Sequence, residues 1–131
     1  ANGQLGRALR GVLRDADFAD RSRVDLASSD PFSNVRFADY DTIVNAAAYT
    51  KVDEAETASG RLEAWATNVS GVALLARAAT EHGITLVHVS SDYVFDGTRD
   101  EYTENDEFAP RGVYGQTKAA GDALVSTVPL A

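Results

Sequence analysis

The sequence predicts an α/β domain built on a doubly wound parallel sheet. Segments with helical and with strand periodicity alternate along the 131 residues, an order typical of parallel sheets. The clearest strand candidate is dense in apolar residues, as expected when helices cover both faces of a sheet. No repeat, low-complexity tract or linker interrupts the alternation. Residues 1–131 therefore predict one domain, which is long enough to bury an apolar core.

The first half of the chain contains one clear helix and one clear strand. Residues 4–13 predict an amphipathic helix. Its apolar face consists of Leu5, Ala8, Leu9 and Val12. Residues 42–45 predict a short buried strand that runs into three alanines, Ala46, Ala47 and Ala48. In the less regular region between them, we expect an edge strand at either residues 17–19 or residues 24–26.

The second half continues the alternation. Residues 62–82 predict a long helix, for which Gly83 supplies the C-terminal stop. The apolar residues expected to face the core are Trp65, Val69, Val72, Ala76 and Ala79. An apolar strand is expected at residues 84–89, a polar loop at residues 96–111 and a last helix at residues 113–125.

The ends of the sequence suggest a partial domain. A doubly wound domain normally places a central strand directly before its first glycine turn, whereas this sequence opens at the turn itself. It also closes on a helix with no strand after it. We therefore expect residues 1–131 to be part of a longer protein, lacking the first strand of the sheet.

Composition limits the partners that we expect. The formal charge of −8 disfavours nucleic acid, because an acidic surface repels phosphate backbones. No apolar run approaches the roughly 18–20 residues that span a bilayer, so no membrane partner is expected. Cysteine is absent, which excludes disulfides and thiolate chemistry and fits a cytoplasmic location.

A glycine turn opens the chain. Gly3 and Gly6 stand immediately before the first helical pattern. Glycine lets a backbone pass close to a pyrophosphate, and the N-terminus of the following helix favours negative charge. The turn therefore predicts a phosphate site of the kind that dinucleotides use, although a flexible N-terminal turn would have the same sequence.

The last helix begins with a pair of residues suited to proton transfer. Tyr114 and Lys118 are four apart, so they share one face of the helix. An ammonium group near a phenol favours the phenolate and makes proton exchange easier at neutral pH. Ser91 follows the apolar strand, at the sheet edge where ligands bind in open α/β folds. The alternatives are an amphipathic helix with an exposed lysine, and a serine that only caps the strand end.

Other polar residues are given structural or weaker roles. His88 lies within an apolar strand and is expected to be a packed core histidine. The acidic run in residues 100–107 is expected to be a solvated loop. Arg21 and Arg23 follow a candidate second strand, where a cation favours the 2′-phosphate of NADP.

Three blocks of sequence carry a resemblance to a known family. They are residues 45–56 (NAAAYTKVDEAE), residues 90–97 (SSDYVFDG) and residues 113–118 (VYGQTK). In this order and spacing they resemble the extended short-chain dehydrogenase/reductase superfamily, whose nucleotide-binding domain is Rossmann-like. More narrowly, they are similar to the dTDP-4-dehydrorhamnose reductase family.

The resemblance implies roles for individual residues. The catalytic residues would be Ser91, Tyr114 and Lys118, the last two also contacting the cofactor. Other cofactor contacts would come from Gly3, Gln4, Leu5 and Gly6 along the pyrophosphate and from Asp25 and Leu26 at the adenine ring. Ala46, Ala47 and Ala48 would leave room for the cofactor, Tyr49 would border it, and Asn68 would support the cofactor site. The substrate contacts would be Val52, Ser91, Asp92, Tyr93 and Tyr114.

The implied reaction is reduction of the C4 keto group of dTDP-4-dehydro-L-rhamnose by NADPH, with NADH as the alternative cofactor. The implied partners are this nucleotide sugar and a second copy of the chain in a homodimer. Some family members hold Mg²⁺ through a glutamate where this chain has Ala8, so no metal is expected. Such enzymes also have a C-terminal substrate lobe, which the sequence lacks.

Two other functions stay open. An epimerase or dehydratase of the same superfamily would also act on a nucleotide sugar. Dehydratases usually follow the catalytic hydroxyl with acidic residues, and here only Asp92 fits before Tyr93. A regulatory subunit that binds dinucleotide without catalysis is the second alternative.

Overall fold

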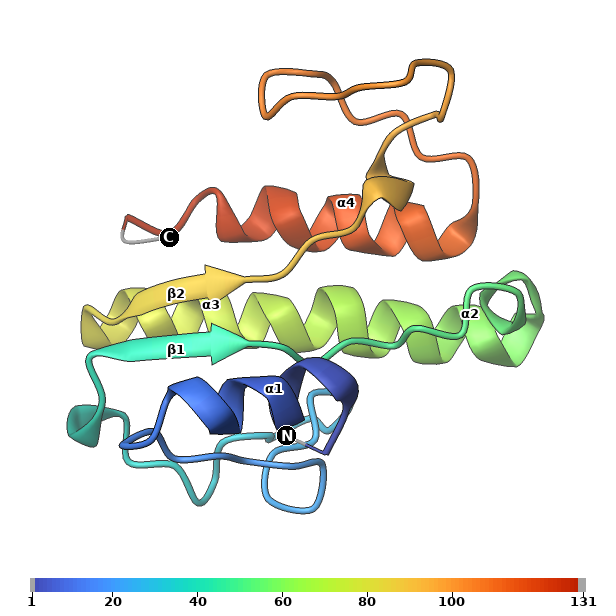
Figure 1. Cartoon of the computed structure of the whole chain (residues 1–131). Helices are drawn as coiled ribbons and strands as arrows, with labels where there is room; N and C mark the ends of the chain where they lie inside the picture. Colours follow the sequence, from blue (N-terminus) through green and yellow to red (C-terminus); the bar gives the residue numbers. More distant parts are fainter. Residues whose placement is uncertain (1, 130–131) are drawn as a thin grey trace.

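A computed structural model describes residues 2–129 (Figure 1). Two parallel strands, β1 (Thr42–Asn45) and β2 (Thr85–His88), form the sheet, with Thr42 opposite Thr85 and Asn45 opposite His88. The α-helices are α1 (Gln4–Val12), α2 (Ala58–Trp65), α3 (Gly71–His82) and α4 (Val113–Val125). Short helical turns are η1 (Phe37–Asp39), η2 (Glu54–Glu56) and η4 (Asp92–Val94), and a π-helical segment, η3 (Ala66–Ser70), joins α2 to α3. The predicted parallel α/β architecture is confirmed.

The elements expected from periodicity are found with small changes at their ends. The bounds of β1 and α4 are those predicted, and α1 ends one residue earlier. The long helix expected from residue 62 begins earlier, at Ala58. The Thr57 hydroxyl accepts a hydrogen bond from the Gly60 N–H at 3.0 Å and so caps this helix.

Gly83 ends α3 as predicted. Its φ of 64° lies in the left-handed region, which glycine adopts without steric strain. The Ile84 N–H then bonds to the Ala79 carbonyl at 2.9 Å, and the chain turns directly into β2.

One face of the sheet carries the core. Side chains of α3 and α4 pack against Leu86 of β2 and half-buried Ile43 of β1. The buried members of this core are Val72, Leu75, Ala76, Ala79, Leu86, Val125 and Val128. On the other face Val44 and Val87 are exposed. Within residues 2–129, therefore, helices bury only one of the two faces that the apolar strand pattern predicts to be covered.

The edge strand expected at residues 17–19 or 24–26 is wrong, because neither segment forms a strand. Asp20 and Asp25 each accept a hydrogen bond from the backbone N–H two residues later, on Ser22 and Ala27, both at 3.0 Å. The Asp25 turn begins inside the second candidate segment and the Asp20 turn follows directly on the first, and such turns divert the backbone from extended pairing.

Trp65 is exposed, which corrects its expected place in the core. It is the last residue before the π-helical segment. A π-turn contains more residues than an α-turn, so it rotates Trp65 away from the face that Val72 and Ala76 bury. None of the helices in residues 2–129 combines the length and apolar character needed to cross a bilayer.

Candidate active site

Four segments gather at the edge of the sheet toward which the strands point. In Figure 1 the arrows of β1 and β2 point to the same end of the molecule, and α1 and α4 both begin at that end. The residues that follow the strands, Ala46 and Ser91 among them, leave the sheet there. Parallel strands bind ligands at this edge.

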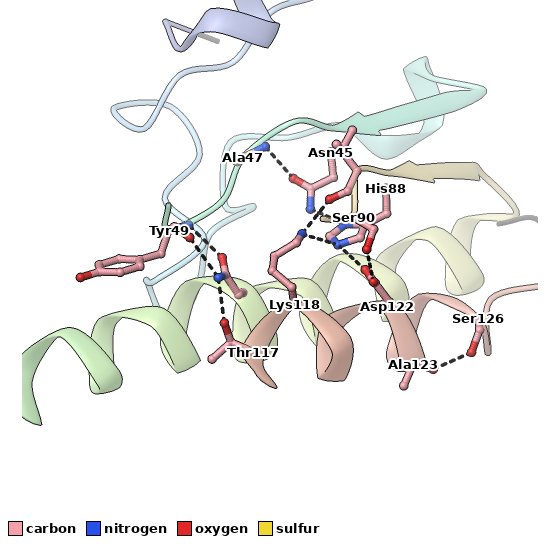
Figure 2. A network of polar contacts seen from close by, with 12 residues as sticks. Asn45, Ala47, Tyr49, His88, Ser90, Thr117, Lys118, Asp122, Ala123 and Ser126 are labelled. Atoms are coloured by element: carbon pink, nitrogen blue, oxygen red, sulfur yellow. Dashed lines mark hydrogen bonds and ion pairs between the residues drawn. The ribbon is translucent and has the colours of Figure 1, made fainter. Parts of the chain in front are cut away.

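Lys118 is buried at this edge, with a relative exposure of 2%. Its Nζ donates to the Val89 carbonyl at 2.7 Å and lies 3.2 Å from His88 Nε2 (Figure 2). The alternative of an exposed surface lysine is therefore wrong. Burial lowers the pKa of Lys118 below its ordinary value, because it disfavours the charged form, and the Asp122 carboxylate opposes that shift.

Tyr114 lies one turn before Lys118 and is also buried. Its ring packs with Ala55, Ala64 and Val113, and makes a T-shaped contact with the Tyr93 ring at 5.5 Å between centroids. Within residues 2–129 the Tyr114 hydroxyl has no hydrogen-bond partner. Packing thus fixes the Tyr114 ring, while its hydroxyl makes no hydrogen bond within residues 2–129.

Ser91 occupies the turn between β2 and α4. Its Oγ accepts a hydrogen bond from the Tyr93 N–H at 3.3 Å and donates to Asp92 Oδ1 at 3.2 Å. Ser91 therefore caps η4, so its side chain has the kind of structural role considered as the alternative to catalysis. η4 packs against α4, so Ser91 belongs to the segment that covers Tyr114. No hydrogen bond joins Ser91 to Tyr114 in the described part of the chain, and its catalytic role stays a prediction.

Close backbone packing keeps η4 beside α4. A Cβ on Gly115 would lie 2.2 Å from the Tyr93 carbonyl oxygen, well inside any normal contact. Only glycine lets the first turn of α4 approach the segment of Ser91 and Tyr93 this closely. The side chains of Asp92 and Tyr93 are exposed on the outer side of this contact.

The start of α1 is open to an anion. Gly3 is its N-cap, in an extended conformation, and among residues 2–129 no side chain caps the first turn. A Cβ on Gly3 would meet no atom within 4 Å, and Gly6 is buried. Gln4 and Leu5 are exposed in the same turn. Backbone N–H groups at such a helix end favour a phosphate, so the residues present fit the pyrophosphate of a dinucleotide.

Asn68 ties the loop after β1 to α4. It is 2% exposed and sits in the π-helical segment. Its Oδ1 accepts from the Tyr49 N–H at 2.8 Å, and its Nδ2 donates to the Tyr49 carbonyl at 3.1 Å and to Thr117 Oγ1 at 3.0 Å (Figure 2). Asn68 thus joins the loop after β1 to α4, and its contribution to a cofactor site stays a prediction. Tyr49 and Val52, both half-buried, pack against the cluster of Tyr114.

Asp25 and Leu26 lie next to α3. Leu26 is buried, and its Cβ approaches Gly71 so closely that a side chain there would clash. Asp25 accepts from Arg21 Nε at 3.1 Å. Hydrogen bonds, the largest from the Ala27 N–H, lower the pKa of Asp25. The contact of Asp25 and Leu26 with the adenine ring stays a prediction.

Sequence reasoning missed the polar residues behind Lys118. His88, expected only to pack in the core, has a side chain that is 4% exposed and contacts Lys118, Asn45 and Asp122. The signals were available: Asn45 ends a strand, and Asp122 lies four residues after Lys118 on one helix face. Among residues 2–129, no three His, Asp or Glu side chains cluster closely enough to hold a metal ion.

Comparisons with known proteins agree with this arrangement. The family described as RmlD substrate binding domain matches residues 1–129. A dTDP-4-dehydrorhamnose reductase from Aggregatibacter actinomycetemcomitans is 42% identical over 135 residues, covering 98% of this chain and 45% of that protein. The crystal structure of such a reductase from Clostridium acetobutylicum superposes with a TM-score of 0.83 at 33% identity, over 97% of this chain and 47% of that one.

A reductase of the same name from Bacillus anthracis, solved in complex with NADP, superposes with a TM-score of 0.82 at 33% identity, over 97% of this chain and 47% of that one. The chain thus spans about half the length of these relatives. The resemblance drawn from the three sequence blocks is confirmed. By the match along its length and by its Rossmann-type fold, this chain belongs to the RmlD substrate binding domain family.

Proposed function

We propose that the chain is the dinucleotide-binding part of a reductase that converts dTDP-4-dehydro-L-rhamnose to dTDP-L-rhamnose. The observation that carries this proposal is the burial of Lys118 at the carboxyl edge of the sheet, one turn from Tyr114 and beside the segment of Ser91. A surface helix would leave a lysine in water, whereas here the ammonium is fixed by the Val89 carbonyl. Relatives named for this reaction share the fold.

NADPH is the proposed cofactor, with NADH as the alternative, since a relative is described in complex with NADP. Its pyrophosphate would lie on Gly3, Gln4, Leu5 and Gly6. Asp25 and Leu26 would border the adenine, and Ala46, Ala47, Ala48 and Tyr49 would border the ring half. Lys118 would hold the nicotinamide ribose. Bound in this way, the cofactor supplies the hydride for the reduction.

The chain's own residues would handle the proton. The Tyr114 hydroxyl, free of protein partners, would donate it to the carbonyl oxygen of the substrate. Ser91 would exchange its bond to Asp92 for one to that oxygen, which stabilises the charge that develops there. Lys118 would favour the phenolate that remains on Tyr114. Asp92, Tyr93 and Val52 would contact the nucleotide sugar, and we place the enzyme in the cytoplasm.

The test uses protein expressed from the complete coding sequence. NADPH oxidation should depend on added dTDP-4-dehydro-L-rhamnose and should fall at least about 100-fold in Tyr114→Phe, the usual contribution of a positioned proton donor. Val12→Thr on the exposed face of α1 is the control and should keep the rate. Cofactor binding without turnover would favour the regulatory subunit instead. Conversion of a nucleotide sugar without net NADPH consumption would favour an epimerase or dehydratase.

A further inference from the structure

A polar network lies around the Lys118 ammonium. Asn45 comes from β1, His88 from β2 and Asp122 from α4 (Figure 2). The strand register places Asn45 directly opposite His88, and Asp122 follows Lys118 by one helical turn. None of these three residues has a part in the proton transfer described above.

Asn45 determines which ring nitrogen of His88 carries the hydrogen. The Asn45 Oδ1 accepts a hydrogen bond from the Ala47 N–H at 3.1 Å, which orients the amide. Its Nδ2 group therefore faces His88 Nδ1, at 2.9 Å, and donates to it. A neutral imidazole that accepts at Nδ1 carries its hydrogen on Nε2.

The Nε2–H of His88 then has one anionic acceptor. Asp122 Oδ1 lies 3.5 Å from Nε2, is buried, and has no other partner in residues 2–129. The second oxygen, Oδ2, is taken by the Ser90 hydroxyl, which donates to it. The Lys118 Nζ lies 3.2 Å from the same Nε2 and donates to the Val89 carbonyl at 2.7 Å. Because an ammonium can only donate, the acceptor for the Nε2–H in this tautomer is Asp122 and not Lys118.

The charges around the network are few. Lys118 is faced by His88 from β2, by Asp122 and Tyr114 on its own helix, and by the neutral Asn45 from β1. Within residues 2–129 Lys118 makes no direct ion pair with Asp122. The two charges lie on either side of His88 Nε2, 3.2 Å from Lys118 Nζ and 3.5 Å from Asp122 Oδ1, and the carboxylate raises the pKa of Lys118 against the effect of burial. Burial, and then the Lys118 charge, lower the pKa of His88, so the ring is neutral near pH 7. The Asp122 side chain is 12% exposed, which leaves its charge weakly screened.

We propose that Asp122 is the counterion of Lys118. His88, held in its Nε2–H tautomer by Asn45, is a positioning residue that fixes the Asp122 carboxylate relative to the Lys118 ammonium. The catalytic meaning of this network rests on the proposed reductase function. Without Asp122, the buried ammonium would have no compensating charge and would lose its proton at lower pH.

The first experiment measures the ammonium directly. In protein expressed from the complete coding sequence, NMR titration of Lys118 Nζ should show a pKa lower by about one unit or more in Asp122→Asn, because an opposite charge is removed nearby. Asp122→Glu keeps the charge and should restore most of the shift. Glu81→Gln, an exposed carboxylate at the end of α3, is the control and should change nothing. An unchanged Lys118 pKa in folded Asp122→Asn overturns the proposal.

The second experiment observes the wild-type protein and uses one variant only to assign its signals. Nitrogen-15 NMR of the imidazole should show His88 with hydrogen on Nε2 and a bare Nδ1, its signals identified by their loss in His88→Gln. Hydrogen on Nδ1 overturns the proposal. Neither experiment requires turnover, so both stand if the reductase assay fails.

Where the wild-type protein is active, a kinetic readout separates positioning from mere folding. Asp122→Asn should shift the alkaline limb of the pH profile of kcat to lower pH by about one unit or more. Asp122→Glu should return the limb toward its wild-type position. A limb that stays in place in an active, folded Asp122→Asn protein counts against the proposal.

Discussion

The Glu56 carboxylate accepts a hydrogen bond from the backbone N–H of Val113, 57 residues along the chain, at 2.7 Å. Val113 is the first residue of α4, and Gly112 before it has no side chain with which to cap the helix. A negative charge at a helix N-terminus is favourable, since the first N–H groups there lack partners. A residue after β1 thereby positions the helix that carries Tyr114 and Lys118.

Glu56→Ala should weaken the start of α4. We expect the free energy of unfolding to fall by about 1 kcal/mol, the usual contribution of a helix cap. Glu56→Gln keeps an acceptor oxygen and should lose less. Chemical denaturation measures both, with Glu63→Ala, at an exposed position of α2, as the control. Equal stability of Glu56→Ala and Glu63→Ala would show that the cap contributes nothing.

Asn68→Ala should lower the free energy of unfolding more than Glu56→Ala does. It leaves the N–H and carbonyl of half-buried Tyr49 without their partner. The Thr117 hydroxyl loses one donor but keeps its own bond to the Tyr114 carbonyl. Each unpaired buried group costs about 1–3 kcal/mol, so we expect a loss of at least about 2 kcal/mol in unfolding free energy. Asn68→Asp should not rescue it, because the carboxylate cannot donate to the Tyr49 carbonyl. Wild-type stability in Asn68→Asp would contradict this account.

Gly115→Ala tests the contact between α4 and the segment after β2. The added Cβ would lie 2.2 Å from the Tyr93 carbonyl oxygen, so one of the two segments must move. Such overpacking costs about 1–3 kcal/mol, and the displacement should also reduce NADPH oxidation. Gly11→Ala is the matched control. Gly11 lies within α1 with nothing near its Cβ, so alanine should stabilise the protein by up to about 1 kcal/mol.

His88 should make stability fall in acid. Burial lowers its pKa from the ordinary 6.5, so below that pH the unfolded chain binds a proton that the folded chain does not. Stability that is complete above 6.5 is therefore lost as pH falls toward the folded pKa. Unfolding free energies at about pH 7 and about pH 5 should differ less in His88→Gln than in wild type. His82→Gln leaves the buried ring in place and should retain the wild-type difference.

Several features of the fold could be predicted from periodicity alone. β1 and α4 have the predicted bounds, because the residues that flank each pattern interrupt it clearly. Gly83 terminates α3 for a local reason, its left-handed φ. The predicted edge strand was wrong, because Asp20 and Asp25 accept hydrogen bonds from the N–H groups of Ser22 and Ala27 in local turns, a competition that apolar periodicity does not register.

The same distinction between local and long-range features holds for the candidate site. Residue type and spacing identified Tyr114 and Lys118, because an i, i+4 pair on a helix must share a face. The network of Asn45, His88 and Asp122 was not predictable in this way. Its members are far apart in the chain and come together only through strand register and helix packing.

By itself, the sequence determined the local order of helices and strands, the glycine turn and the tyrosine–lysine pair, since each depends on neighbours within a few residues. Only the tertiary structure decided that Lys118 is buried rather than solvated, and that His88 and Asp122 surround it. The reason is physical: burial and charge pairing depend on which distant segments pack together, and no local pattern contains that information.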